Sequence, residues 1–503
     1  MKPRILVWSG NAYVYLGITR SIQEKFDCDL FCISNADGNA SKYLKDQKIV
    51  NFKKTWFFPN YLTEENKKPD TSYLKKFEEK YNIDLWKIIY GDRRLRKDNQ
   101  RYYNFTRDEH LLIIEQACKF FEKILDEVKP DFLMIQATTS HNDHLLYCMC
   151  KALKIKVMML RTSRTGYRLI ISEDLESIDK IESKPQKLPG NKTFEEIRNF
   201  FNEFSARKQI ASFEPNYKAP KTEKIKAAIE FFLFGNSSND NYVNYGKSRI
   251  SIIKQGLGIK HKFRKNKIKS FMDKNFLRTI KNEEFVYFPF HKEPERMLDI
   301  SAPYYTDQKT VAKNIAKSLP IKYKLYVKDH PAQMQLTTMW KRSIQYYQEL
   351  LDLPNVEVIH PSVKNEELIK KCAMVFTING SSSLEALTFN KPSMILTNAD
   401  FTNLSGITKL EKMEDFPKIF ENALRQKVDL NELSEFMYDL EQNSFECDIY
   451  SVYKNFYSTF PYPGFLKWPE HPPKKVKNYL DSQREIFDQL ADQHLEKIEQ
   501  LKN

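Results

Sequence analysis

The chain has 503 residues, of which 41% are hydrophobic and 29% are charged, a composition typical of a folded globular protein. This length exceeds what one ordinary hydrophobic core accommodates, so we expect two domains and an additional segment. The formal net charge of +14 favours anionic partners such as sugar nucleotides, polyanionic glycans, acidic lipid surfaces or nucleic acid, without choosing among them.

Several classes of protein lack support in the sequence. The seven cysteines are scattered without the spacing of a zinc site, so we expect reduced thiols, no metal and a cytoplasmic location. The short apolar run before Gly10 is wrong for a signal peptide, and no stretch has the length of a membrane-spanning helix. There is no P-loop, no G-x-G-x-x-G and no nucleic-acid-binding module.

The first part of the chain alternates strands and helices. RILVWSG at 4–10 predicts a buried strand and a polar turn, followed by the helix YLGITRSIQEKF and the strand CDLFCIS. A long amphipathic helix over 108–128 ends near Pro130 and precedes an apolar strand at 132–135. This order predicts a Rossmann-like N-terminal domain over residues 1–175.

The remaining chain divides into three parts. Residues 176–275 are polar and lysine-rich and predict a helical linker or insertion, whose basic cluster at 260–269 faces either solvent or an anionic lipid or glycan. Alternating strands and helices return over 276–425, which predicts a second α/β domain. Residues 426–503 are expected to form a helical tail that packs back across both domains.

Polar residues of the second domain follow predicted strands, where ligands bind in open parallel sheets. The three loops are FHKEPER with His291 and Glu295, KDHPAQ with Lys328 and His330, and TINGSSSLEAL with Gly380, Ser381, Ser382, Ser383 and Glu385. Cations, imidazoles, hydroxyls and a close-approaching glycine backbone suit a phosphate, and a carboxylate suits ribose hydroxyls. Each motif also has a structural alternative, namely a His-Pro turn or a serine helix cap.

Four segments carry a resemblance to a known family. VYFPFHKEPERML, LPIKYKLYVKDHPAQ, LPNVEVIHP and VFTINGSSSLEALTFNKPSMIL resemble, in order and spacing, the C-terminal half of capsule and surface polysaccharide biosynthesis proteins. Those proteins are similar to the Kdo-transferase and sialyltransferase-like branch of GT-B glycosyltransferases. The resemblance is good over 283–398 and weaker over 108–172. It implies an α/β fold of two Rossmann-like domains facing a cleft, with residues 1–175 on the acceptor side and residues 276–425 binding the nucleotide sugar.

The resemblance also implies roles for individual residues in donor binding. Lys328 and His330 would contact the donor phosphate, the loop Gly380–Ser382 would close over it, and Glu385 would hold the ribose. The family commonly has a second glycine before the helix, where this chain has Ser383, which can still cap the helix and donate a hydrogen bond. We expect His291, on the neighbouring loop, to belong to the same donor site.

Transfer of a sugar to a hydroxyl group needs a base, which the N-terminal domain of a two-domain cleft would usually supply. His141 and Asp143 follow the strand at 132–135 and are candidates, with Glu295 of the second domain as their rival. His330 is expected to act in catalysis by stabilising the charge on the leaving group.

Residues after two other N-terminal strands are expected to line the acceptor side of the cleft. Gly10 and Asn11 follow the first strand, and Arg161 and Arg164 follow the strand KVMML, where they could bind an acidic acceptor.

The leading interpretation is a metal-independent glycosyltransferase that moves a sugar from a nucleotide donor to a growing capsule-type or lipopolysaccharide-type polysaccharide. We expect no cofactor, because the nucleotide sugar is a substrate, with a CMP-sugar slightly favoured over a UDP-sugar. The partners would be that donor and a glycan or glycolipid acceptor, with peripheral contact to the anionic inner face of the cytoplasmic membrane and no nucleic acid. The alternatives are a nucleotide-sugar epimerase of the same fold and a degenerate, non-catalytic glycan-binding or assembly protein.

Overall fold

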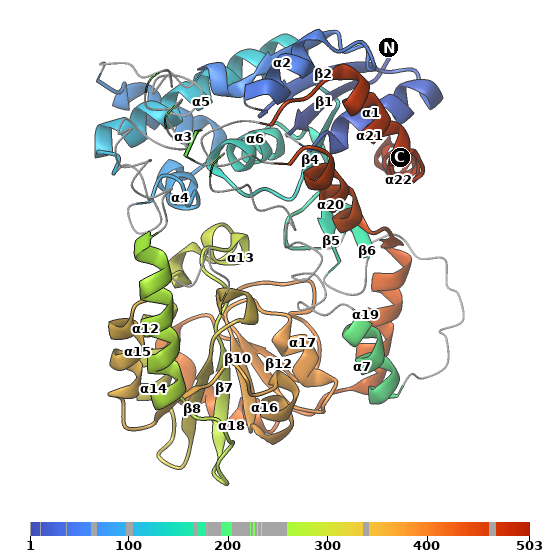
Figure 1. The fold of residues 1–503 in the computed structure, drawn as a ribbon. Coiled ribbons are helices and arrows are strands. Elements are labelled where there is room, and N and C mark those ends of the chain that lie inside the picture. The colour runs from blue at the N-terminus through green and yellow to red at the C-terminus, as the bar shows by residue number, and fades with distance from the viewer. Residues whose placement is uncertain are drawn as a thin grey trace.

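The computed structural model contains two sheets built mainly of parallel strands, one above the other in Figure 1, with helices packed around each. The residues that it describes are 2–10, 12–36, 38–61, 68–96, 104–163, 168–177, 179, 193–203, 222, 225–226, 229, 233, 259–334, 342–461 and 469–502. The two sheets confirm the predicted fold class of two Rossmann-like domains that face a cleft.

The upper sheet has seven strands in the order β13-β6-β5-β4-β1-β2-β3. Their bounds are β1 Arg4–Ser9, β2 Asp29–Ser34, β3 Lys54–Phe57, β4 Phe132–Gln136, β5 Lys156–Thr162, β6 Arg168–Ser172 and β13 Phe445–Glu446. Strands β1 to β5 pair in parallel, whereas β6 runs antiparallel to both β5 and β13. Ile5, Leu6 and Val7 of β1 are fully buried, because helices cover both faces of the sheet.

The lower sheet is parallel throughout, in the order β12-β11-β10-β7-β8-β9. Its strands are β7 Phe285–Pro289, β8 Lys324–Lys328, β9 Val356–Ile359, β10 Met374–Thr377, β11 Ser393–Ile395 and β12 Ile407–Lys409. All four residues of β10 are buried, as expected for a central strand of this sheet type. The two central strands, β10 and β7, therefore direct their following loops toward the upper domain.

The helices of the upper domain are α1 Val14–Lys25, α2 Gly38–Asp46, α3 Thr71–Tyr81, α4 Leu85–Tyr90, α5 Arg107–Val128 and α6 His141–Ala152. The long helix α5 begins at a capping box, in which Thr106 and Glu109 exchange side-chain-to-backbone hydrogen bonds. It buries an apolar stripe that includes Ile114, Phe121 and Ile124, which is why the amphipathic pattern predicted it.

The helices around the lower sheet are α12 Ile259–Asn275, α13 Arg296–Asp299, α14 Gln308–Ser318, α15 Ile344–Leu351, α16 Asn365–Lys371, α17 Ser382–Leu387 and α18 Phe416–Leu424. Most of the segment expected as a linker lies outside the described residues. Within it, α7 (Phe194–Glu203) packs beside α19 (Leu430–Gln442), and α12 buries Ile268 and Met272 in the core of the lower sheet.

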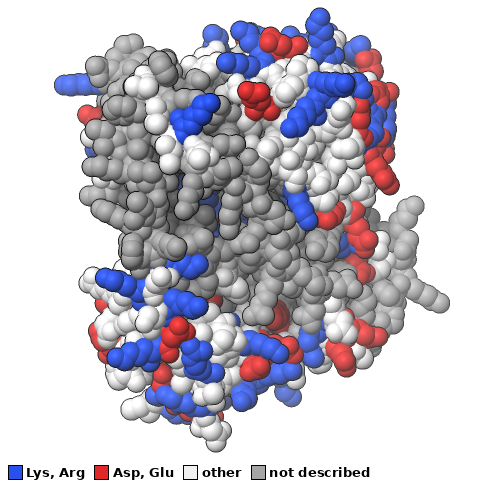
Figure 2. Space-filling model, in the orientation of Figure 1, with Lys and Arg blue, Asp and Glu red and all other residues white. Residues whose placement is uncertain are grey.

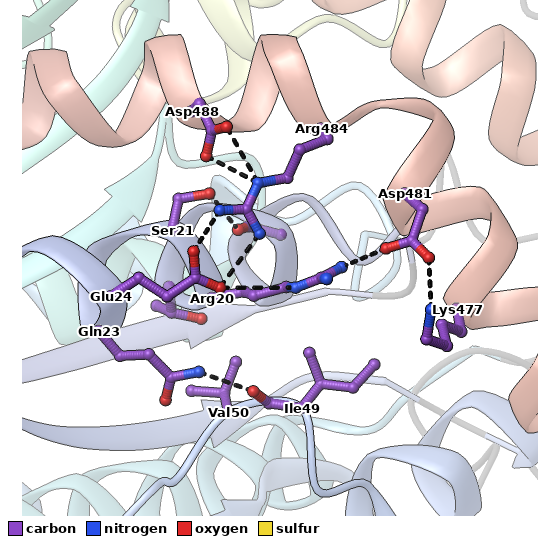
Figure 3. Close-up of polar contacts among 12 residues, drawn as sticks. Arg20, Ser21, Gln23, Glu24, Ile49, Val50, Lys477, Asp481, Arg484 and Asp488 are labelled. Carbon is purple, nitrogen blue, oxygen red and sulfur yellow. Dashed lines mark hydrogen bonds and ion pairs between the residues drawn. The ribbon is translucent and has the colours of Figure 1, made fainter.

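The chain returns to the upper domain after α19, so that both ends of the chain lie there (Figure 1). The returning helices are α20 Ile449–Thr459, α21 Pro473–Ser482 and α22 Arg484–Lys502. Charged side chains join them to α1, as Figure 3 shows: Arg484 pairs with Glu24, and Arg20 with Asp481 at 2.6 Å. Beneath these exposed pairs, Phe487 of α22 packs directly over Gly17 of α1.

Four strands were not predicted from the sequence, namely β3, β6, β12 and β13. Each is short or lies at or beside a sheet edge, and β13 has only two residues. Its pairing with β6 joins residues 276 positions apart, Phe445 with Leu169. Local periodicity contains no information on such a contact, because it depends on the return of the tail.

The surface of the described residues shows no gathering of one charge on the face drawn in Figure 2, where basic and acidic side chains are interspersed over both halves. None of the described helices is long and apolar enough to cross a membrane.

The contact between Gly17 and Phe487 predicts that close packing of α22 on α1 contributes to the stability of the protein. A Cβ at position 17 would lie 2.3 Å from the buried ring of Phe487, so Gly17→Val should lower the free energy of unfolding by about 1–3 kcal/mol through overpacking. Thermal unfolding measures the loss, and Phe487→Ala in the same chain should recover part of it. Gly10→Ala is the control, since no atom lies within 4 Å of its added Cβ. Equal stability of the wild type and Gly17→Val would contradict this packing.

Candidate functional site

A cavity of about 790 Å³ lies between the two sheets. The upper domain contributes residues at the ends of β4 and β5, such as Gln136 and Arg161, and the lower domain contributes the loops after β7, β8 and β10. Helix α20 of the tail closes a further side with Tyr450 and Tyr453. The site is therefore assembled from the carboxyl ends of parallel strands, where the topology places ligands.

The loop after β7 brings two predicted residues, His291 and Glu295, into the cavity. The backbone of His291 is held by Gln308, which accepts from its N–H at 2.6 Å, and by Arg342, which donates to its carbonyl oxygen at 2.8 Å. The ring nitrogens of His291 lie 3.1 Å from the Glu295 carboxylate and 3.4 Å from the backbone N–H of Asn379. Because an N–H donates to the second nitrogen, Nδ1 carries the proton that His291 donates to Glu295.

The surroundings of Glu295 favour the ionised form of its carboxyl group. Burial by itself would raise its pKa, but the hydrogen bond from His291 and the charges of the surrounding basic groups hold that pKa below its ordinary value. About a third of the side chain remains exposed, and it lines the cavity. The group can therefore accept a proton from a molecule bound there.

His330, after β8, also lines the cavity and is neutral at physiological pH. Burial lowers the pKa of its imidazole to about 4, an effect that Glu295 opposes and that His291 and Lys292 reinforce. Its Nδ1 accepts a hydrogen bond from the backbone N–H of Ala332 at 3.1 Å. The neutral ring consequently carries its proton on Nε2, which makes that nitrogen a hydrogen-bond donor.

The loop after β10 contributes Gly380, Ser381 and Ser382 to the cavity. A Cβ at position 380 would lie 2.6 Å from the hydroxyl oxygen of Thr377, which accepts the Gly380 N–H at 3.0 Å, so this turn needs a glycine. Ser383 does not line the cavity: its buried hydroxyl donates to the carbonyl of Gly380 at 2.8 Å and closes the turn from behind.

Glu385 and Lys328 lie close together at the back of the same loop. Burial, together with the nearby Glu366 carboxylate, raises the pKa of Glu385 to about 7, while Lys328 acts in the opposite direction. Glu385 lines the cavity, but Lys328 is buried and donates to the amide oxygen of Asn365, which does line it. The lysine predicted to contact phosphate directly thus reaches the cavity wall through Asn365.

The two N-terminal candidates for the base lie outside the cavity. His141 is buried, with Nδ1 2.7 Å from the carboxylate of the fully buried Asp92, which also pairs with Arg94. Asp143 caps the start of α6, where it accepts from the backbone N–H groups of Thr139 and Ser140. Both side chains hold α6 in place, and the structure brings neither to the reacting groups. Among the three predicted bases, only Glu295 faces the cavity.

The residues predicted to bind the acceptor differ in their positions relative to the cavity. Arg161 lines the cavity, but its guanidinium makes a bidentate pair with Asp400 of the lower domain, with both distances 3.1 Å. The guanidinium of Arg161 is therefore engaged in a contact between the two domains, which the sequence pattern could not reveal. Gly10 is exposed and does not line the cavity. Asn11 and Arg164 lie outside the described residues.

Several cavity residues were not predicted. They are Gln136, Arg198, Arg296, Lys364, Asn365, Thr377, Asn379, Tyr450 and Tyr453. Asn379 and Thr377 adjoin the predicted glycine loop and could have been included with it. Arg198, Tyr450 and Tyr453 come from helices outside both sheets, and no motif marks them. Among the described residues, no group of three or more His, Cys, Asp or Glu side chains is placed to hold a metal ion.

Comparison with solved structures gives matches of low identity. The UDP-GlcNAc 2-epimerase from Methanocaldococcus jannaschii is 16% identical, with coverage of 88% of this chain and 100% of the epimerase at a TM-score of 0.23. Thermosulfurimonas dismutans KpsC, a beta Kdo 2,7 transferase, is 13% identical, with coverage of 71% and 87% at a TM-score of 0.29. The beta Kdo 2,4 transferase of the same KpsC is 10% identical, with coverage of 69% and 86% at a TM-score of 0.31.

Comparison with sequences is more specific. None of the curated proteins matches the chain. Residues 192–441, which include all three loops of the lower domain that line the cavity, match the model of a family described as "Capsule polysaccharide biosynthesis protein". The resemblance found in the sequence is thereby confirmed over residues 192–441.

Proposed function

We propose that the chain is a glycosyltransferase that moves a sugar from a nucleotide donor to a growing capsule-type polysaccharide. The observation that carries this proposal is the convergence of His291, Glu295, His330 and the loop Gly380–Ser382 on one cavity between two α/β domains. The match of residues 192–441 to capsule polysaccharide biosynthesis proteins supports the same biological setting.

The donor would bind to the lower domain. The Nε2–H of His330 and the hydroxyl groups of Ser381 and Ser382 offer donors to a phosphate, and Gly380 lets the backbone come close to it. Glu385 lines the same cavity and offers oxygens to ribose hydroxyls. Lys328 would contribute through Asn365, by fixing the direction of that amide. We propose no cofactor, with a CMP-sugar as the favoured donor.

Glu295 is our proposed base. In the transfer step, its carboxylate takes the proton of the acceptor hydroxyl while that oxygen forms a bond to the anomeric carbon of the donor. The bond from that carbon to the donor phosphate breaks, and the nucleotide leaves with the bonding electrons. A hydrogen bond from Nε2 of His330 would stabilise the negative charge that develops on the leaving phosphate.

The donor site is tested by nucleotide-dependent thermal stability. One of CMP, UDP, GDP and ADP at a hundredfold its Kd should stabilise the wild type by about 2.7 kcal/mol, a shift of a few degrees, because it binds only the folded protein. His330→Ala should lose this shift, since the phosphate loses a donor. His360→Ala is the matched control, because that histidine also precedes a proline but pairs with Asp273 outside the cavity. Stabilisation by none of the four nucleotides would contradict the donor site.

The role of Glu295 is tested by activity. The assay uses a sugar attached to the nucleotide that stabilises the chain as the donor, and the surface polysaccharide of the cells that make this protein as the acceptor. Glu295→Gln should lower kcat about 10²–10⁴-fold because it removes the base. The nucleotide-dependent stabilisation should remain. Asp143→Asn, which lies outside the cavity, should keep its transfer rate.

Two results would contradict this assignment. Full activity of Glu295→Gln would exclude the carboxylate as the base. Conversion of the free nucleotide sugar to an isomer in the absence of any acceptor would instead identify an epimerase.

A peripheral membrane contact is also part of our proposal. Its support is the net charge of +14 together with the exposed Lys267, Lys269 and Lys274 on α12, at the outer side of the lower domain in Figure 1. The chain should sediment with vesicles that contain phosphatidylglycerol at low salt and be released at high salt, because salt screens the attraction. Vesicles of phosphatidylcholine alone are the control. A chain that stays in the supernatant with both vesicles at low salt would refute this contact.

A further inference from the structure

Helix α20 has two neighbouring apolar faces of different composition. Ile449, Val452 and Phe456 are buried in the core that covers the upper sheet. A second stripe consists of tyrosines at positions 450, 453 and 457, whose spacing of three and four residues places them along one side of the helix. The first face explains why the helix packs against the sheet, whereas Tyr450 and Tyr453 touch the same core with side chains that are only partly buried.

The tyrosine stripe begins inside the cavity and continues away from it. Tyr450 and Tyr453 line the cavity, whereas Tyr457 is one helical turn further on and 44% exposed. In Figure 1, α20 lies between the two domains, beside the end of β5. The three tyrosines therefore lie along one side of α20 between the proposed reaction site and the surface.

The row is held in a fixed position. The hydroxyl of Tyr453 accepts a hydrogen bond from the side-chain amide of Gln136, at the end of β4. The chain before α20 is anchored by β13 and by Arg168, which donates to the hydroxyl of Ser444 at 2.7 Å. The Tyr479 hydroxyl donates to the carbonyl of Val452 at 3.2 Å. Rings on such a rigid helix need little further ordering to bind a ligand.

We propose that Tyr450, Tyr453 and Tyr457 form a track that binds successive sugar rings of the acceptor chain, an inference that rests on the proposed transferase function. The C–H groups on one face of a pyranose make that face apolar, so it packs against an aromatic ring, while the phenol hydroxyl bonds to the sugar's polar edge. Rows of aromatic rings with few polar groups suit such ligands. Lengthening the acceptor should therefore add contacts.

The position of the track favours the acceptor over the donor. The groups suited to phosphate and ribose, such as His330 and Glu385, belong to the lower domain, whereas α20 belongs to the core of the upper domain. A donor held by the loops of the lower domain does not need Tyr457, whereas a polymer that leaves the cavity along α20 would pass over it. The family match ends at residue 441, before α20, so the track lies in the part of the chain outside that match.

The test uses the surface polysaccharide of the producing cells, cut into short and long fragments, with affinity measured by calorimetry. For the wild type, long fragments should bind about tenfold more tightly than short ones, the effect of one added aromatic contact of about 1.4 kcal/mol. Tyr457→Ala should abolish that gain and leave short fragments unaffected. Tyr450→Ala should weaken both. Tyr304→Ala, which alters a tyrosine 82% exposed elsewhere, is the matched control and should behave as the wild type.

The outcomes separate this proposal from the transferase function. Equal affinity of Tyr457→Ala and wild type for long fragments, or no binding of any fragment while a nucleotide still stabilises the chain, overturns the track and leaves the donor site in place. Length-dependent binding that needs Tyr457, without stabilisation by any nucleotide, supports the track and removes the transferase. Since Tyr457 is exposed, its substitution should leave the melting temperature unchanged.

Discussion

The buried ion pair between Arg161 and Asp400 sets the geometry on which the cavity depends. Their side chains are 4% and 3% exposed, and they join the end of β5 in the upper domain to the loop after β11 in the lower domain. Two charges are removed from water here, which is tolerated because the bidentate geometry and the bonds of Arg161 to Ser172 and Ser177 satisfy the guanidinium. Loss of either partner would leave an unpaired buried charge at the wall of the site. The two domains therefore keep their spacing only while both Arg161 and Asp400 are present.

Around this connection, burial divides the ionisable groups of the cavity into two kinds. His330 is kept neutral, with its proton directed to Nε2 by the Ala332 N–H, whereas the carboxylate of Glu295 is kept ionised by His291. A hydrogen-bond donor, His330, and a proton acceptor, Glu295, are thus maintained within one cavity at the same pH. Opposed environments for neighbouring groups are what acid–base chemistry requires, and they arise here from two adjacent loops of a parallel sheet.

The tail contributes to the site as well as to stability. The residues after 442 cross from the lower to the upper domain. Strand β13 pairs there with β6, and helix α22 packs over α1. This return carries Tyr450 and Tyr453 to the cavity, although they lie more than 60 residues beyond Glu385 in the sequence. The cavity therefore combines loops of a parallel sheet with a helix of the tail, so its two sides differ in composition.

The amino-acid sequence by itself determined the two α/β units, the main strands and the three loops of the lower domain, because periodicity and the residues after each strand are local properties. His291, Glu295, His330 and Gly380 could be predicted for the same reason: they follow three neighbouring strands of one sheet, β7, β8 and β10. Only the tertiary structure decided that Arg161 pairs with Asp400, that His141 and Asp143 support α6, that Lys328 donates to Asn365, and that α20 reaches the cavity. Each of these depends on contacts between distant segments, whose burial and pairing energies no local pattern of residues encodes.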